Sequence, residues 1–299
     1  ELVVLPYQLE LVDALSGKIM ALLATCGARA VEPVSVDEAY LDLTGVPDPE
    51  SVVRNLRRAI AQETKCTASA GIGPNKLLAR VATSQAKPNG QGRLPDDPVA
   101  AARALQHLPA SDLPGVGWKT AKVLREKMGV DSVGDLRACG SGRLQQEFGP
   151  RKGEELFQAA MGHDPRPVVQ WKPRHTVGAE YNWALRFSTH PQALAFLDKV
   201  AHREVEAAVS RFGYSARQLT LKVMKRKASS RSSSGHKFLG HGPANSFSKS
   251  QRLAQATRRH KDLIPVARAL FLAMDAEHTL PAPELRGMGL TASLLTGGP

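Results

Sequence analysis

The first hundred residues alternate between segments with helical and with strand-like apolar spacing. Leu11, Leu15 and Ile19 share one helical stripe, and Gly27 follows as a C-terminal stop. Arg57 lies outside the stripe of the second helix and is expected to be solvated. The expected order is helix, strand, strand, helix, strand and helix, at residues 9–26, 31–35, 39–43, 49–63, 66–73 and from 74 onward. This order is typical of an α+β half-domain.

The middle of the chain has short helical segments separated by glycine and proline. We expect a short helix from residue 96 that ends before Pro109, and we place a domain boundary near residue 100. A proline-rich, basic stretch at residues 164–174 predicts an extended interdomain linker. Further helices are expected at residues 133–137, 142–148 and 151–161.

The last third combines long helical patterns with strand-like alternation. Leu219, Leu221 and Val223 fall on one face of a predicted strand, and Lys222 falls on the other. The serine-rich stretch at residues 229–235 predicts a hairpin loop. Helices are expected at residues 191–212 and 253–274, and strands at 175–184, 218–225 and 285–290. The pattern predicts a second α+β unit.

Composition narrows the class of protein. Of the 299 residues, 42% are hydrophobic and 5% aromatic, which is typical of a globular chain with two or three cores. The sequence has no run of about 18 apolar residues, so we expect no membrane span, and its start lacks the basic segment of a signal peptide. Cys26, Cys66 and Cys139 lack the spacing of a zinc site and are expected to be reduced core thiols.

The net charge of +12 is unevenly placed along the chain. Residues 1–100 have 10 Lys and Arg against 12 Asp and Glu, whereas residues 101–299 have 30 against 16. This basic region predicts a polyanionic partner, because Lys and Arg neutralise phosphates and release counterions. Charge alone also fits an RNA-binding, ribosomal or merely soluble protein.

Asp37 and Glu38 are adjacent acids that interrupt a strand-forming run. Neighbouring residues on a strand point to opposite faces, so two carboxylates on one face require a strand end or a hairpin tip. Mg2+ prefers oxygen ligands of this kind and completes its shell with phosphates and water. A solvated turn is the commoner explanation of an isolated pair.

Two lysines lie at the ends of the helix that starts near residue 74. Lys76 begins this helix directly after a strand, where free N–H groups and the helix dipole attract an anion to which Lys76 would add its charge. Lys87 lies in the proline-containing turn that follows the helix. A lone turn lysine is usually solvated.

Residues 113–124 have the form of a helix-hairpin-helix. Gly115 and Gly117 make a glycine turn ahead of a helical pattern that includes Lys119 and Lys122. N–H groups at such a helix start bind a phosphate without reading bases, which favours DNA binding. A glycine-rich helix start unrelated to nucleic acid is the alternative.

Three motifs occur in a characteristic order and spacing: Ser35-Val36-Asp37-Glu38-Ala39, residues 69–80, and Lys87-Pro88-Asn89-Gly90-Gln91. Together they resemble the Y-family translesion DNA polymerases, and residues 113–117 resemble the hairpin of that family's thumb domain. Residues 144–150, 162–168 and 179–182 resemble its deoxycytidyl transferase branch most closely. The resemblance covers essentially the whole chain.

The resemblance implies an α+β polymerase of three domains. These are a partial palm with a ferredoxin-like sheet at residues 1–99, a helical thumb with the helix-hairpin-helix at 100–170, and an α+β little-finger domain at 171–299. The implied activity is template-dependent deoxycytidyl transfer to a DNA primer end in translesion synthesis and DNA repair. Asp37 and Glu38 would be catalytic ligands of two Mg2+ ions. Lys87 would contact the dNTP triphosphate.

The resemblance also implies partners and a location. Primer-template DNA and a dNTP, with dCTP expected, would bind in the nucleus, and other replication or translesion polymerases would dock through regions outside this sequence. The implied DNA contacts are Gly115, Gly117, Trp118, Lys119 and Thr120 in the hairpin, and Arg174, His175, Thr176, Val177, Gly178, Ala179, Glu180, Tyr181 and Asn182 in a little-finger strand.

The sequence departs from the family pattern at its start. A family palm has a further metal-binding aspartate near its N-terminus, and the fingers contribute a tyrosine and an arginine to the triphosphate; neither has a match here. The arginine that selects dCTP in this branch is also expected upstream. We therefore expect a fragment that begins after the fingers, with weak or absent polymerisation by this chain alone and better retained DNA binding.

Two other functions compete with the nucleotidyltransferase. In a non-catalytic DNA-binding module, the helix-hairpin-helix and the basic sheet bind a duplex, and Asp37 and Glu38 have no catalytic role. In an RNA-binding protein, binding is independent of a primer-template junction. The salt dependence of binding and Mg2+-dependent dNTP binding discriminate among the three.

Overall fold

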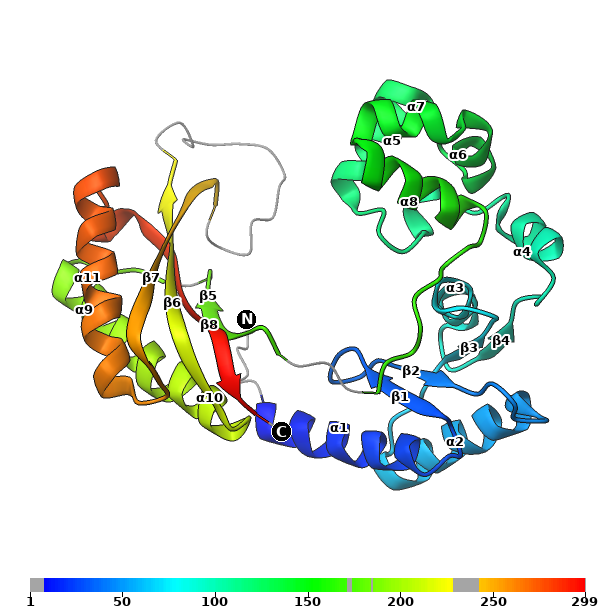
Figure 1. Cartoon of the computed structure of the whole chain (residues 1–299), viewed down its shortest axis with the longest axis horizontal. Coiled ribbons are helices and arrows are strands. Elements are labelled where there is room, and N and C mark those ends of the chain that lie inside the picture. Colours follow the sequence, from blue (N-terminus) through cyan, green and yellow to red (C-terminus); the bar gives the residue numbers. More distant parts are fainter. Residues whose placement is uncertain (1–7, 171–173, 184, 228–241, 299) are drawn as a thin grey trace, which may run out of the picture. The chain divides into compact units, whose positions relative to one another are not determined.

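The computed structural model describes residues 8–170, 174–183, 185–227 and 242–298. The chain forms two compact units, at residues 1–171 and 172–299. Figure 1 shows the helices and strands of each unit, coloured along the sequence. Each unit combines helices with strands, which confirms the predicted α+β class.

The first unit begins with two helices that pack against a hairpin. These elements are α1 (Leu9–Ala24), β1 (Ala30–Pro33), β2 (Ala39–Asp42) and α2 (Pro49–Thr64). The α2 helix begins at Pro49 because the Asp48 carboxylate accepts the Ser51 N–H at 3.0 Å. A small core joins the helices to the hairpin, with Leu23, Leu56 and Ile60 buried at its centre. The four elements lie close to their predicted positions.

A parallel strand pair follows, with one helix between its strands. The elements are β3 (Ala70–Ile72), α3 (Lys76–Ala86) and β4 (Gln91–Arg93). Gly71 lets α3 lie close to β3, since a Cβ at this position would meet the backbone of Ala79 and Thr83. The sequence prediction missed β4, because three residues are too few to show alternation and the preceding Lys87-Pro88 suggested only a turn.

The rest of the first unit is helical. It consists of α4 (Pro98–Leu105), the 3-10 turn η1 (Ala110–Asp112), α5 (Trp118–Met128), α6 (Val133–Cys139), α7 (Ser141–Phe148) and α8 (Pro150–Ala160). One core runs from α3 to α8 and includes Leu78, Leu105, Leu124, Leu144 and Leu156. The domain boundary expected near residue 100 stays a prediction.

The second unit is a four-stranded antiparallel sheet with helices on one face (Figure 1). The strand order is β5 (Thr176–Tyr181), β8 (Leu285–Gly297), β6 (Tyr214–Arg226) and β7 (Ala244–Thr257). Leu219, Leu221 and Val223 of β6 are fully buried in the core, whereas Lys222 is half-buried. The predicted faces of this strand are confirmed. The other elements are α9 (His190–Lys199), the π-helical η2 (Val200–Glu206), α10 (Ala207–Arg211), α11 (His260–His278) and η3 (Ala282–Glu284).

The predicted helix at residues 253–274 is wrong at its start. Residues 253–257 belong to β7, which pairs with β6 so that Arg252 faces Gln218 and Thr257 faces Ala216. The helix begins only at His260, and Asp262 in its first turn accepts a hydrogen bond from the Thr257 hydroxyl at 2.5 Å. The pairs on either side, Gln218 with Arg252 and Ala216 with Thr257, hold the intervening Leu-Ala-Gln-Ala sequence extended against its helix propensity.

Three further expectations concern the cysteines, the membrane and the loop at residues 229–235. The cysteines are free, but Cys66 is exposed and the other two are half-buried, so the expected core location is wrong for Cys66. It lies in the loop that leaves α2, beyond the last buried turn of that helix. Among the described residues, no helix is long and apolar enough to cross a bilayer. The hairpin loop expected at residues 229–235 lies outside the described residues.

Candidate active site and nucleic-acid interface

Asp37 and Glu38 lie in the tip of the β1–β2 hairpin, and both side chains are exposed. Ser35 organises this tip: its hydroxyl donates to Asp37 Oδ1 at 2.6 Å and accepts the Glu38 N–H at 3.1 Å. The N–H groups of Val34 and Ser35 both donate to the Glu38 carbonyl, at 2.8 and 3.1 Å. The two carboxylates therefore leave the backbone from one tightly hydrogen-bonded turn.

The oxygen atoms of this turn are suited to a hard cation. Within the described part of the chain, no basic side chain is paired with Asp37 or Glu38. Two exposed carboxylates without a competing cation match the ligand preference of Mg2+, which retains several waters and binds substrate phosphates. The residues of the hairpin tip thus fit the metal that the sequence predicts.

A buried acid anchors the hairpin to the rest of the unit. Glu32 on β1 forms an ion pair with Lys76 at the start of α3, and both side chains are buried. Glu32 Oε2 also accepts the N–H of Val169 at 2.9 Å, and the Lys76 ammonium lies 5.3 Å from the centroid of the Tyr40 ring. Lys76 is therefore held inside the protein. Its expected role beside an anion is wrong, because its charge is already neutralised by Glu32.

Lys87 is exposed at the end of α3, in a turn held by Arg57. The guanidinium of Arg57, on α2, donates to the Ala68 carbonyl at 2.8 Å and to the Asn89 carbonyl at 2.7 Å. It also reaches the side-chain oxygen of Asn89 at 3.1 Å. The expectation that Arg57 is merely solvated is wrong. The sequence did not predict this role, because Asn89 lies 32 residues from Arg57 and no distinctive spacing links the two.

The predicted DNA-binding hairpin is built around the start of α5. Leu113 and Val116 are buried, whereas Gly115, Gly117, Trp118 and Lys119 are exposed and Thr120 is half-buried. Gly115 has a φ of +92°, which requires glycine, and its carbonyl accepts a hydrogen bond from Lys152 at 3.0 Å.

The N-terminus of α5 has N–H groups without a side-chain cap. Gly117 is the N-cap residue, and no side chain covers the first turn of this 11-residue helix. The first N–H groups of an α-helix have no partner within the helix and lie at the positive end of its dipole. Lys119 and Lys122 are in the same two turns, although Lys122 is near Glu126 at 3.8 Å. The hairpin can therefore bind a backbone phosphate.

Strand β5 divides the predicted little-finger contacts between two faces. Thr176, Gly178 and Glu180 are exposed. Val177 is buried in the core, and Ala179 and Tyr181 pack against that core. Of the neighbouring candidates, His175 is exposed and Asn182 half-buried. On this strand, therefore, Thr176 and Glu180 direct side chains to the open face, and Gly178 offers only its backbone there.

Arg174 and Tyr181 are held by contacts within the second unit. The Arg174 guanidinium lies 4.0 Å from the centroid of the Phe212 ring, and its backbone N–H donates to the Tyr214 hydroxyl at 3.2 Å. The Tyr181 hydroxyl donates to Glu204 at 2.9 Å. Burial and this contact with Glu204 raise the pKa of Tyr181. Tyr181 is therefore a packing residue of the sheet.

The open face of the sheet is polar. By strand register, Glu180 and Lys222 face the same residue, Gly289, from opposite sides, and the Lys222 ammonium donates to Glu180 at 2.7 Å. The Thr220 hydroxyl lies 2.8 Å from that of Ser250 on β7. A surface with hydroxyl groups and a lysine is suited to a phosphate backbone.

Three family models match the chain in sequence order. Residues 1–84 match the impB/mucB/samB family, residues 111–164 the DNA polymerase-iota thumb domain, and residues 174–299 the impB/mucB/samB family C-terminal domain. Each match contains one of the candidate sites. They are, in order, the β1–β2 hairpin tip with Asp37 and Glu38, the turn at residues 113–117 before α5, and strand β5.

Curated relatives include DNA repair proteins and bacterial polymerases. The chain is 32% identical to DNA repair protein REV1 of Arabidopsis thaliana over 99% of its own length and 26% of the relative's. It is 33% identical to DNA repair protein Rev1 of Drosophila melanogaster over 87% of its length and 26% of the relative's. A DNA polymerase IV of Neisseria meningitidis is 46% identical over 46% of the chain and 39% of the relative. The chain thus spans about a quarter of the REV1 proteins that it matches.

Solved structures share the fold. The Y-family DNA polymerase chimera Dbh-Dpo4(243-245)-Dbh superimposes with a TM-score of 0.79 at 22% identity, over 98% of this chain and 79% of the other. An insertion ternary complex of Dbh DNA polymerase superimposes with a TM-score of 0.60, over 97% of this chain and 78% of the other. These structures show the fold. The family models at residues 1–84, 111–164 and 174–299, together with the REV1 and DNA polymerase IV relatives, show that the chain belongs to the Y family of DNA polymerases.

Proposed function

We propose that this chain takes part in template-dependent nucleotidyl transfer to a DNA primer end during translesion synthesis and DNA repair. Its REV1 relatives are named as DNA repair proteins, and several others as DNA polymerase IV. The observation that carries the proposal is the hairpin tip, where Asp37 and Glu38 share one hydrogen-bonded turn within the segment that matches the polymerase family.

Y-family DNA polymerases are metal-dependent, and the hairpin tip has the ligands for this chemistry. We assign Asp37 and Glu38 as carboxylate ligands of Mg2+, which when bound lowers the pKa of the primer hydroxyl and offsets charge on the phosphoryl oxygens. The buried Glu32–Lys76 pair fixes the base of the hairpin. Lys87, exposed in the turn that Arg57 holds, would contact the triphosphate.

Each of the three proposed domains has its own role. Residues 1–99 act as the palm and residues 100–170 as the thumb, in which the start of α5 binds the DNA backbone. Residues 171–299 act as the little finger, whose open sheet face lies against the duplex. These contacts position the primer-template junction without reading bases.

The similarity to REV1 proteins supports a more specific proposal for the nucleotide and for the location in the cell. We propose dCTP as the nucleotide and the nucleus as the location, in line with the resemblance of residues 144–150 and 179–182 to the deoxycytidyl transferase branch. Docking of other replication or translesion polymerases, through regions outside this sequence, is part of the same proposal.

Ternary-complex formation tests the proposal. The affinity of the chain for a fluorescent primer-template is measured under four conditions: without additions, with Mg2+, with dCTP, and with Mg2+ and dCTP together. Linkage predicts that Mg2+ and dCTP together tighten DNA binding by about fivefold or more, since both would complete one site. Equal affinity under all four conditions would favour a non-catalytic DNA-binding module, and equal binding of duplex RNA would favour the RNA-binding alternative.

A further inference from the structure

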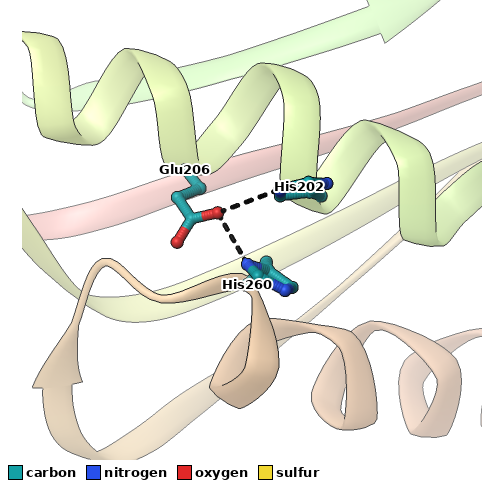
Figure 2. Close-up of side chains that lie close together, drawn as sticks. All are labelled: His202, Glu206 and His260. Atoms are coloured by element: carbon teal, nitrogen blue, oxygen red, sulfur yellow. Dashed lines mark hydrogen bonds and ion pairs between the residues drawn. The ribbon is translucent and has the colours of Figure 1, made fainter.

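Two histidines and a glutamate meet in the second unit, on the side of the sheet that the helices cover. His202 and Glu206 come from η2, and His260 is the first residue of α11. Figure 2 shows both rings directed toward the Glu206 carboxylate. His260 Nδ1 lies 2.7 Å from Glu206 Oε2, and His202 Nε2 lies 3.7 Å from the same oxygen. One ligand atom from each residue lies within 4.8 Å of the other two.

We propose that His202, Glu206 and His260 form a zinc site that ties η2 to α11. Two imidazole nitrogens and one carboxylate oxygen are a donor set that Zn2+ uses, whereas Mg2+ prefers oxygen ligands throughout. The cluster therefore selects a different metal from the acidic hairpin of the first unit.

The three ligand atoms lie within 4.8 Å of one another, so side-chain movements of about one ångström would bring them to the spacing of a tetrahedral site. In a tetrahedral site with metal–ligand distances of about 2.1 Å, ligand atoms lie roughly 3.4 Å apart. The His202–Glu206 separation of 3.7 Å is close to this value, and the His260–Glu206 hydrogen bond of 2.7 Å must lengthen slightly. The His202 side chain is 58% exposed, which leaves room for a water molecule as the fourth ligand.

A simple ion pair explains less of this arrangement than a metal does. A bond between a protonated His260 and Glu206 would account for the 2.7 Å contact alone. It leaves unexplained why the His202 ring also lies 4.2 Å from the His260 ring, centroid to centroid, with its Nε2 only 3.7 Å from the same Glu206 oxygen. A shared cation binds both imidazoles in their neutral form.

The backbone at the cluster is also unusual. Residues 200–206 form a π-helix, and π-helical turns are rare and often lie at functional sites. The η2 segment packs against α11, and both elements cover the sheet. A metal bridge between them would stabilise the helical layer of this unit.

Zinc titration of the whole chain tests the site. Chelator-treated protein is titrated with Zn2+ by calorimetry, and Co2+ is used in parallel because its visible absorption reports tetrahedral coordination. The variants are His202→Gln, Glu206→Gln and His260→Gln, with His107→Gln as the matched control, since His107 is exposed in the first unit. Zinc-dependent thermal stabilisation is recorded for each variant, so that any metal-independent loss of stability is subtracted.

We expect one equivalent of zinc bound at the cluster. Each cluster variant should weaken zinc binding at least about tenfold and lose the zinc-dependent rise in Tm, whereas His107→Gln should match the wild type. Absence of zinc binding at micromolar concentration would show that the cluster is only an ion pair. Binding that all four variants retain would place the metal elsewhere. Either result overturns the proposal.

Discussion

At the residue scale, the charges of the proposed DNA-binding face are partly neutralised within the protein. Glu180 is an acid on a surface expected to meet phosphates, and the structure pairs it with Lys222 at 2.7 Å. Both side chains are more than one-third exposed, at 37% and 41%, so the pair contributes little to stability. Its main consequence is electrostatic, since the carboxylate offsets a lysine that would otherwise neutralise a phosphate.

Replacement of Glu180 by Gln should therefore strengthen DNA binding. With Lys222 released, the slope of log K against log[salt] should become steeper by about 0.9, the value for one additional phosphate contact. Fluorescence anisotropy at several salt concentrations measures this slope. The matched control is Asp198→Asn, which removes an acid paired with Arg268 on the helical side of the same unit. Equal effects of both substitutions would mean that only net charge matters.

Asp164 should make the first unit sensitive to acid. Burial raises the pKa of its carboxyl, but the hydrogen bonds and charge of Arg166 outweigh that effect and lower the pKa overall. A lowered folded-state pKa stabilises the protein above the unfolded value of about 3.9, and this stabilisation is lost as pH falls through the folded pKa. Asp164→Asn should thus reduce Tm at neutral pH and much less at pH near 3. A Tm difference that is independent of pH would contradict this assignment.

At the element scale, the sequence predicted elements with strong periodicity and missed those fixed by long-range pairing. Strand β6 was identified from the alternation of Leu219, Leu221 and Val223. Of strand β7, residues 244–252 were assigned no element and residues 253–257 were predicted as helix, because the pairing with β6 does not show in the local sequence. The hairpin acids were found because they are adjacent. The His202–Glu206–His260 cluster was not, because 54 residues separate Glu206 from His260.

Arg57 illustrates how one element positions another. Its guanidinium joins α2 to the Ala68 carbonyl and to the turn that bears Lys87. Arg57→Ala leaves these acceptors without their charged donor and should lower the free energy of unfolding by about 1–3 kcal/mol. The exposed neighbour Arg58 is the control, and Arg58→Ala should change stability by less than about 0.5 kcal/mol. Urea unfolding compares the two variants, and equal losses would rule out a special role for Arg57.

At the scale of the whole molecule, the chain consists of two units with separate hydrophobic cores. The core of the second unit includes Leu197, Leu219, Phe271 and Leu290, all within residues 172–299. A unit with its own core can unfold on its own. Calorimetry of the whole chain should therefore show two transitions, and zinc should raise only the transition of the second unit. A single cooperative transition would contradict this independence.

The proposed activity depends on whether the hairpin acids hold Mg2+ for a nucleotide. The most direct measurement is the Mg2+-dependent binding of labelled dCTP to the chain–primer-template complex, for the wild type, Asp37→Asn, Glu38→Gln and the exposed control Glu63→Gln. Loss of a carboxylate ligand should weaken this binding at least about tenfold, with DNA affinity in the absence of dCTP preserved. Glu63→Gln should behave as the wild type. Undiminished Mg2+-dependent dCTP binding in both hairpin variants would contradict the account.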